Sequence, residues 1–126
     1  MRYLLDSTLL IDHANRDPDA NMTLAGLFEE GHELFTCDIV TAEVLSWNRT
    51  EDLRHLTVLL DSLEYVSTTP TAARWAAESR RKRHGSGGTR ALGDAIIAGV
   101  AVDLDATIVT RNATDFIRQG VPVLEY

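Results

Sequence analysis

Short apolar segments of strand length alternate with amphipathic helical segments along the chain, and this alternation restricts the possible folds most strongly. Apolar runs of strand length occupy residues 2–5, 33–37, 65–67, 106–109 and 121–124. Between them, apolar residues recur at helical spacing, as in residues 51–63 and 91–103. Strands separated by helices pair in parallel, because a parallel connection needs a long crossover. The pattern therefore predicts an α/β fold whose parallel sheet is covered by helices on both faces.

Local signals predict where several helices begin and end. Ser7 is expected to cap the first helix, and Asp38 the helix after the second strand. Thr69 before Pro70 is a helix start with a threonine cap. The polar stretch 15–21 is expected to end the first helix, and a second helix is expected over 22–30. A glycine-rich loop at 85–88 and a short helix over 113–119 complete the expected elements.

Size and composition favour one soluble globular domain over residues 1–126. The chain has 126 residues, is 44% hydrophobic and 25% charged, and contains a single cysteine. Such a chain buries enough surface to fold without a metal or a disulfide. Cys37 alone excludes an internal disulfide and a cysteine-rich zinc site. We find no membrane-spanning or signal-like segment, so we expect a cytoplasmic protein with no membrane partner.

The charge is distributed unevenly. The formal net charge is −7, which by itself disfavours a nucleic-acid partner. However, residues 74–90 carry six basic side chains and one acidic one, whereas the other 109 residues carry 6 basic and 18 acidic side chains. This basic segment is either a phosphate-binding surface or a solvated helix end.

Four carboxylates are predicted to lie at the edge of the sheet where α/β proteins place their sites. Asp6 ends the first strand, Glu43 lies in the helix after the second strand, and Asp94 is in the first turn of a helix. Asp115 follows the fourth strand. Sites in parallel sheets form beyond the carboxyl ends of the strands. Carboxylates gathered there would suit a hard cation such as Mg²⁺ or Mn²⁺.

Each acid also has a structural interpretation, which the residues leave open. Asp6 can cap the first helix, and Glu43 can be a solvent-exposed acid on the surface of its helix. Asp94 can pair with Arg90 one turn earlier. Asp115 stands three residues after Asn112, which is the spacing of a capping arrangement.

Four short motifs resemble those of PIN-domain proteins, specifically the VapC-type toxins. They occur in the order and spacing of that family: Tyr3–Asp12 (YLLDSTLLID), Thr41–Val44 (TAEV), Ala91–Ala98 (ALGDAIIA) and Thr110–Phe116 (TRNATDF). The resemblance implies a PIN-like three-layer fold with a central parallel sheet of about five strands flanked by helices.

The resemblance also implies an activity and a site. It implies an Mg²⁺- or Mn²⁺-dependent endoribonuclease that hydrolyses RNA phosphodiesters as the toxin of a type II toxin–antitoxin pair. Its expected partners are RNA, a VapB-type antitoxin and a second toxin subunit in a homodimer. The family's acidic metal pocket corresponds to Asp6, Glu43, Asp94 and Asp115. Its supporting polar residues correspond to Thr110 and Asn112.

One position departs from the family pattern, and three other functions remain possible. Thr8 stands where family members usually carry asparagine, so a PIN domain that binds RNA or antitoxin without cleavage is an alternative. Metal-free cleavage through the RNA 2′-hydroxyl would need a histidine base, but the four histidines share no motif. A signalling receiver domain would need a lysine after a late strand, whereas Lys82 falls in an expected helix.

Overall fold

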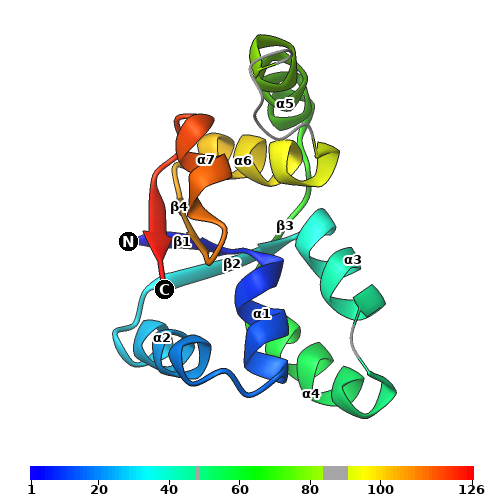
Figure 1. Cartoon of the computed structure of the whole chain (residues 1–126), viewed down its shortest axis with the longest axis vertical. Coiled ribbons are helices and arrows are strands. Elements are labelled where there is room, and N and C mark those ends of the chain that lie inside the picture. Colours follow the sequence, from blue (N-terminus) through cyan, green and yellow to red (C-terminus); the bar gives the residue numbers. More distant parts are fainter. Residues whose placement is uncertain (48, 84–90) are drawn as a thin grey trace.

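The computed structural model describes residues 1–47, 49–83 and 91–126, and within them a parallel sheet runs through the middle of the molecule (Figure 1). Its five strands are β1 (Arg2–Leu5), β2 (Glu33–Cys37), β3 (Glu64–Val66), β4 (Thr107–Thr110) and β5 (Val123–Glu125). They pair in the order β3-β2-β1-β4-β5, and every pairing is parallel. The α/β prediction, with a parallel sheet of five strands, is confirmed.

Helices cover both faces of this sheet. In chain order they are α1 (Ser7–Ala14), α2 (Pro18–Glu29), α3 (Asp38–Trp47), α4 (Thr50–Asp61), α5 (Pro70–Arg83), α6 (Leu92–Leu104) and α7 (Ala113–Arg118). Figure 1 shows α5, α6 and α7 on one side of the strands and α1, α2 and α4 on the other. None of the helices in the described ranges is long and apolar enough to cross a bilayer.

The strand order reverses direction at β1, which pairs with β2 on one side and with β4 on the other. Both central strands are anchored in the core, where Leu4, Leu5 and Ile108 are fully buried. The chain leaves β1 and β4 toward opposite neighbours, and in parallel sheets the crevice beyond the carboxyl ends of two such strands is where sites form. Asp6 and Thr110 stand at these two strand ends.

The second helix starts earlier than predicted, at Pro18 instead of residue 22. The carboxylate of Asp17 accepts a hydrogen bond of 2.9 Å from the N–H of Ala20, and Pro18 occupies the first helical turn. Aspartate before proline is a strong helix start, and the polar composition of residues 15–21 concealed it. The helix stops as expected at Gly31, whose φ of 71° is left-handed.

Two of the three predicted caps are wrong. Ser7 is the first residue of α1, and its hydroxyl donates to Glu43 instead of capping the helix. The carboxylate of Asp38 accepts hydrogen bonds from the Tyr65 hydroxyl and, at 2.9 Å, from the N–H of Thr68. It therefore joins α3 to the segment after β3. The Thr69 cap is confirmed by a 3.0 Å bond from the N–H of Ala72.

Helices α5 and α6 approach each other so closely that one position must be glycine. A Cβ atom built on Gly99 would lie 2.4 Å from the backbone oxygen of Ala72, far inside van der Waals contact. Because α6 carries Asp94 in its first turn, this packing also sets the position of that carboxylate. The predicted glycine loop at 85–88 lies outside the described residues.

Replacing this glycine should destabilise the protein. We expect Gly99→Ala to lower the free energy of unfolding by about 1–3 kcal/mol, because overpacking outweighs the gain in helix propensity. The matched control is Gly26→Ala in α2, where the nearest atom to a new Cβ is 3.8 Å away. That change should be neutral or stabilising by up to ~1 kcal/mol. Urea unfolding of the three proteins measures both effects, and a Gly99→Ala variant as stable as the parent would contradict the close contact.

Candidate active site

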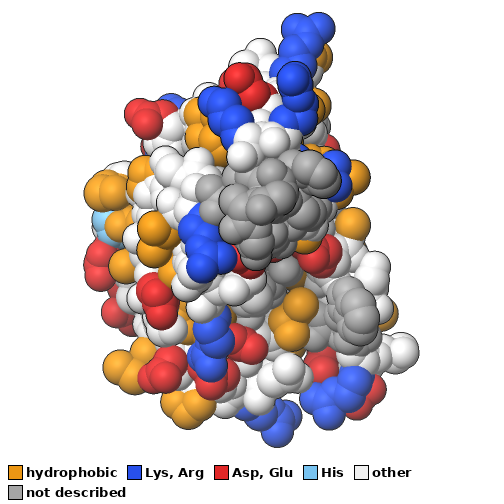
Figure 2. Space-filling model, turned by 45° about the horizontal axis from the view of Figure 1, so that its top comes forward, with side chains coloured by type: hydrophobic (Ala, Val, Ile, Leu, Met, Phe, Trp, Pro, Cys, Tyr) orange, Lys and Arg blue, Asp and Glu red, His pale blue; other side chains and the backbone are white. Residues whose placement is uncertain are grey.

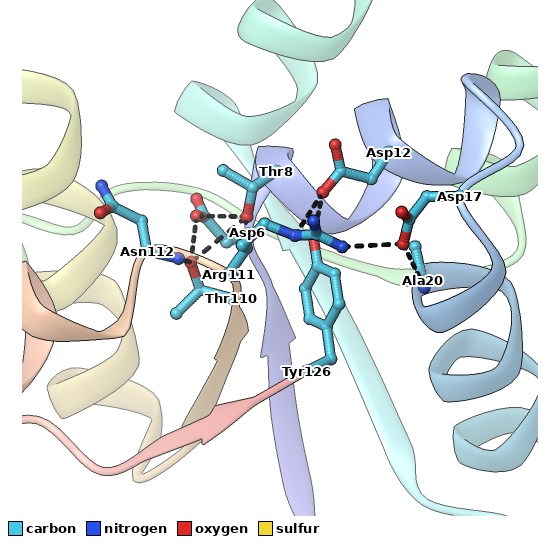
Figure 3. Close-up of polar contacts among 9 residues, drawn as sticks. All are labelled: Asp6, Thr8, Asp12, Asp17, Ala20, Thr110, Arg111, Asn112 and Tyr126. Atoms are coloured by element: carbon cyan, nitrogen blue, oxygen red, sulfur yellow. Dashed lines mark hydrogen bonds and ion pairs between the residues drawn. The ribbon is translucent and has the colours of Figure 1, made fainter.

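The carboxylate of Asp6 lies buried in the crevice between β1 and β4, with 3% of the residue exposed. Its Oδ2 atom accepts hydrogen bonds from the hydroxyl of Thr110 at 2.7 Å and from that of Thr8 at 3.1 Å (Figure 3). Burial raises the pKa of Asp6, and the two hydroxyls oppose this effect by stabilising the charged form. Asp6 is the N-cap residue of α1, although its side chain makes no capping hydrogen bond to the helix.

Both threonine hydroxyls are oriented by backbone N–H groups of the loop after β4. The N–H of Asn112 donates to Thr110 Oγ1 at 2.9 Å, and the N–H of Arg111 donates to Thr8 Oγ1 at 3.2 Å. Each hydroxyl therefore accepts from the backbone and has its own proton free to donate to Asp6. Thr8 thus makes a polar contact with Asp6.

Glu43 extends from α3 toward the same crevice. Its Oε1 atom accepts a 3.4 Å hydrogen bond from the hydroxyl of Ser7. Partial burial raises the pKa of Glu43, and the negative charge of Asp6 adds to the shift. Glu43 is therefore half-buried beside another carboxylate, which excludes the interpretation as an ordinary solvated helix acid.

Asp94 interacts with all three of the other predicted acids. Its pKa is raised to about 6, first by partial burial and then by the charges of the other carboxylates: Asp6, Glu43 and Asp115. Negative charges close together disfavour further ionisation, so each of these three carboxylates makes the charged form of Asp94 less favourable. Arg90, the alternative partner of Asp94, lies outside the described residues.

Asp115 is held at the start of α7 by its neighbour Asn112. The Nδ2 group of Asn112 donates to Asp115 Oδ2 at 3.4 Å, and the asparagine side chain makes no capping bond to the helix. The capping interpretation of this pair is therefore wrong. Instead, the asparagine amide orients the carboxylate.

These four carboxylates are what we call the acidic pocket, because the charges of Asp6, Glu43 and Asp115 all act on Asp94. No ion pair joins any of them to an arginine or lysine of the described ranges. The described acids, histidines and cysteine also contain no group of three or more side chains gathered closely enough to hold a metal ion as they stand. Even so, a cluster of carboxylates without a basic partner has the oxygen donors and the charge that suit Mg²⁺ or Mn²⁺.

An arginine that sequence reasoning missed fixes the loop beside this pocket. The Arg111 guanidinium forms ion pairs with Asp12 at 3.1 Å and with Asp17 at 2.7 Å, and it lies 5.0 Å from the centre of the Tyr126 ring (Figure 3). The Tyr126 hydroxyl donates to Asp12 at 2.8 Å. Arg111 therefore joins the loop after β4 to α1, α2 and the C-terminal residue. Only the fold brings these distant positions together, so no local signal could have revealed this role.

The raised pKa of Asp94 predicts how its replacement changes stability. The folded state binds the Asp94 proton more tightly than the unfolded state, so this stabilisation is present below about pH 4 and is lost as the pH rises through about 6. In metal-free buffer, Asp94→Asn should therefore gain stability over the parent between pH 4 and pH 8. One pKa unit corresponds to ~1.4 kcal/mol, which sets an upper limit of about 3 kcal/mol, reduced by solvent screening of this half-buried group.

Urea unfolding at several pH values measures this gain. The control is Asp61→Asn, which removes an exposed carboxylate at the end of α4, far along the chain from the four acids. An Asp94→Asn effect that is equal at pH 4 and pH 8 would contradict its place in the acidic pocket.

Comparisons with known proteins agree with this fold. The PIN domain family model matches residues 3–121. Ribonuclease VapC19 of Mycobacterium tuberculosis is 30% identical over 114 residues, which cover 90% of each chain. The structure of VapBC2 from Rickettsia felis bound to a DNA fragment from their promoter has a TM-score of 0.83 at 23% identity and covers 100% of this chain and 99% of that one.

A toxin–antitoxin complex from Klebsiella pneumoniae has a TM-score of 0.78 at 22% identity, covering 97% and 95% of the two chains. These structures share the fold described above at low sequence identity. The family model covers all four acidic positions of the pocket. The chain belongs to the PIN domain family.

Proposed function

We propose that this chain is an Mg²⁺- or Mn²⁺-dependent endoribonuclease that acts as the toxin of a VapBC-type pair. The observation that supports the proposal is that Asp6, Glu43 and Asp115 follow β1, β2 and β4, the strands around the switch point, and that their charges help to raise the pKa of Asp94. The 30% identity to Ribonuclease VapC19 supports the reaction class. Acids without a basic partner in the described chain would repel an RNA phosphate, so the activity needs a cation there.

The proposed metal ligands are the four acids of the pocket. Asp6 and Asp94 are the first candidates for direct ligands, and Glu43 and Asp115 would bind a second ion or hold waters. When bound, the cation lowers the pKa of a coordinated water and offsets charge that develops on the phosphate.

The polar neighbours of the acids have positioning roles in this proposal. Thr110 and Thr8 donate to Asp6 and favour its charged form at the end of β1. Ser7 fixes one oxygen of Glu43. The Asn112 amide orients Asp115. Each of these hydrogen bonds limits the rotation of the carboxylate that it contacts.

The basic segment 74–90, whose described part lies in α5, is the proposed contact for the RNA backbone. Figure 2 shows Lys and Arg side chains gathered at the α5 end of the molecule. Arg74, Arg80 and Arg81 are exposed along this helix, while Lys82 pairs with Glu78 at 3.7 Å. Exposed arginines at this end can bind phosphates on either side of the cleavage position.

The proposed partners follow from the related complexes. The similarity to chains of VapBC and toxin–antitoxin complexes supports a VapB-type antitoxin as partner. We also propose that residues 1–126 form a single domain and that the toxin is a homodimer. A PIN domain that binds without cleaving remains the second candidate. Thr8 gives it no specific support, since its hydroxyl contacts Asp6.

RNA cleavage should require a divalent cation. We expect EDTA to abolish cleavage by the purified chain, and Mg²⁺ or Mn²⁺ to restore it. The products should carry 5′-phosphate and 3′-hydroxyl ends, as attack by water activated on a metal would give. Asp94→Asn should lose cleavage while remaining folded, whereas the control Asp61→Asn should cleave like the parent.

Mapping of product ends on a defined RNA distinguishes the candidates. Cyclic 2′,3′-phosphate ends that persist in EDTA would contradict metal-assisted hydrolysis and favour attack by the RNA 2′-hydroxyl. RNA binding without cleavage in Mg²⁺ and in Mn²⁺ would identify the non-cleaving binder.

A further inference from the structure

The side chain of Arg111 attaches the loop after β4 to three other parts of the molecule and points away from the Asp6 carboxylate (Figure 3). Its Nε atom lies 3.1 Å from Oδ2 of Asp12 in α1, and one terminal nitrogen lies 2.7 Å from Oδ2 of Asp17. The guanidinium carbon lies 5.0 Å from the centroid of the Tyr126 ring. We call Arg111, Asp12, Asp17 and Tyr126 the arginine clamp.

Both acids of the clamp are held by a second hydrogen bond that does not involve Arg111. Asp12 Oδ2 accepts from the Tyr126 hydroxyl at 2.8 Å, and Asp17 Oδ2 accepts from the N–H of Ala20 at 2.9 Å. The two oxygens are therefore fixed in place for the guanidinium, whose planar fork of N–H donors binds both at once. A lysine has no such fork, so it would keep the charge and lose this geometry.

The backbone of Arg111 connects the clamp to the acidic pocket. Its N–H donates to Thr8 Oγ1 at 3.2 Å, and the Thr8 hydroxyl donates to Asp6 Oδ2 at 3.1 Å. Thr8 Oγ1 also lies 3.3 Å from Thr110 Oγ1, which is a second acceptor for the single proton of Thr8. The Arg111 N–H occupies one lone pair of Thr8 Oγ1 and so restricts the rotation of this hydroxyl. A displaced Arg111 would therefore release Thr8 from its place beside Asp6.

We propose that Arg111 and Tyr126 are positioning residues of the proposed metal site, which act through Thr8 on the carboxylate of Asp6. The proposal rests on the proposed function, because it concerns the cation that the acidic pocket would hold. Loss of a hydrogen-bond partner behind a metal ligand typically lowers metal affinity ~10–100-fold. The clamp acts one contact further from the ligand, so we expect the lower end of this range.

Charge and positioning predict different outcomes when Arg111 is replaced. Arg111→Ala removes a positive charge and leaves Asp12 and Asp17 without their ion pairs, so Coulomb attraction alone would tighten the binding of a cation. Arg111→Lys keeps the charge, so Coulomb attraction alone would leave the affinity unchanged. Positioning predicts weaker binding in both variants, because each loses the fork that holds the loop after β4.

Mn²⁺ binding to the full-length protein without RNA measures this effect apart from cleavage. By calorimetry, we expect Arg111→Lys to bind Mn²⁺ about tenfold more weakly than the parent. Tyr126→Phe removes only the hydroxyl bonded to Asp12, so its affinity should lie between those of the parent and Arg111→Lys. The matched control is Arg2→Lys, since Arg2 pairs with Glu33 at 3.2 Å at the opposite end of β1 from Asp6. This control should bind Mn²⁺ like the parent.

A double-mutant cycle with Thr8→Val tests whether Arg111 acts through the Thr8 hydroxyl. In the Thr8→Val background, Arg111→Lys should change the Mn²⁺ affinity by less than about twofold, because the contact that transmits its effect is gone. A general loosening of the structure would instead give the same tenfold loss in both backgrounds and would overturn the proposal. Thermal unfolding midpoints verify that each variant is folded. Should Arg111→Lys fail to fold, Tyr126→Phe carries the test, and an affinity equal to that of the parent would overturn the proposal.

Other results separate this proposal from the proposed function. A parent protein that binds no Mn²⁺ overturns both. A parent that binds Mn²⁺, together with an Arg111→Lys variant of equal affinity, overturns this proposal alone. Tighter Mn²⁺ binding by Arg111→Ala does so too, since it would be an effect of charge. If Arg111→Lys raised only the KM for RNA and left Mn²⁺ affinity unchanged, Arg111 would be a direct RNA contact instead.

Discussion

The buried carboxylate of Asp6 is the interaction on which the rest of the site depends. A carboxylate charge in a residue that is only 3% exposed is unfavourable unless hydrogen bonds or a cation compensate for it. The hydroxyls of Thr110 and Thr8 supply part of this compensation, and two N–H groups of the loop after β4 orient both hydroxyls. Burial still prevails and raises the pKa of Asp6, so the pocket favours a proton or a cation at that carboxylate. The proposed metal would meet this need.

Sheet topology is what places the other acids around Asp6. Because β1 lies between β2 and β4, the chain segments that follow these strands converge at one edge. Glu43 comes from α3, the helix after β2, and Asp115 from α7, the helix after β4. Asp94 arrives on α6, whose position depends on the close approach of Gly99 to the backbone of Ala72. The ion pairs of Arg111 with Asp12 and Asp17 then hold the β4 loop against α1 and α2. The packing of Gly99 against Ala72 and the ion pairs of Arg111 both lie outside the acidic pocket, and both help to position its side chains.

The sequence predicted the parts of this structure that depend on periodicity and on local motifs. The strands and the positions of the four acids follow from apolar runs and from four short motifs. The exact starts of the helices were harder to predict from the sequence. Serine and aspartate favour helix caps, but Ser7 and Asp38 make tertiary hydrogen bonds instead. Arg111 could not be recognised, since its partners become neighbours only in the folded chain.

The electrostatic coupling of the four acids is the central claim, and an NMR titration of the side-chain carboxyl carbons tests it directly. In metal-free protein, Asp94 should titrate near pH 6, well above the ordinary value for aspartate. In Asp6→Asn, the Asp94 midpoint should fall, because one of the neighbouring negative charges has been removed. Chemical shifts of backbone amides distant from residue 6 would verify that the variant keeps its fold. An Asp94 midpoint near 4 in the parent, or one that Asp6→Asn leaves unchanged, would contradict a shared acidic pocket.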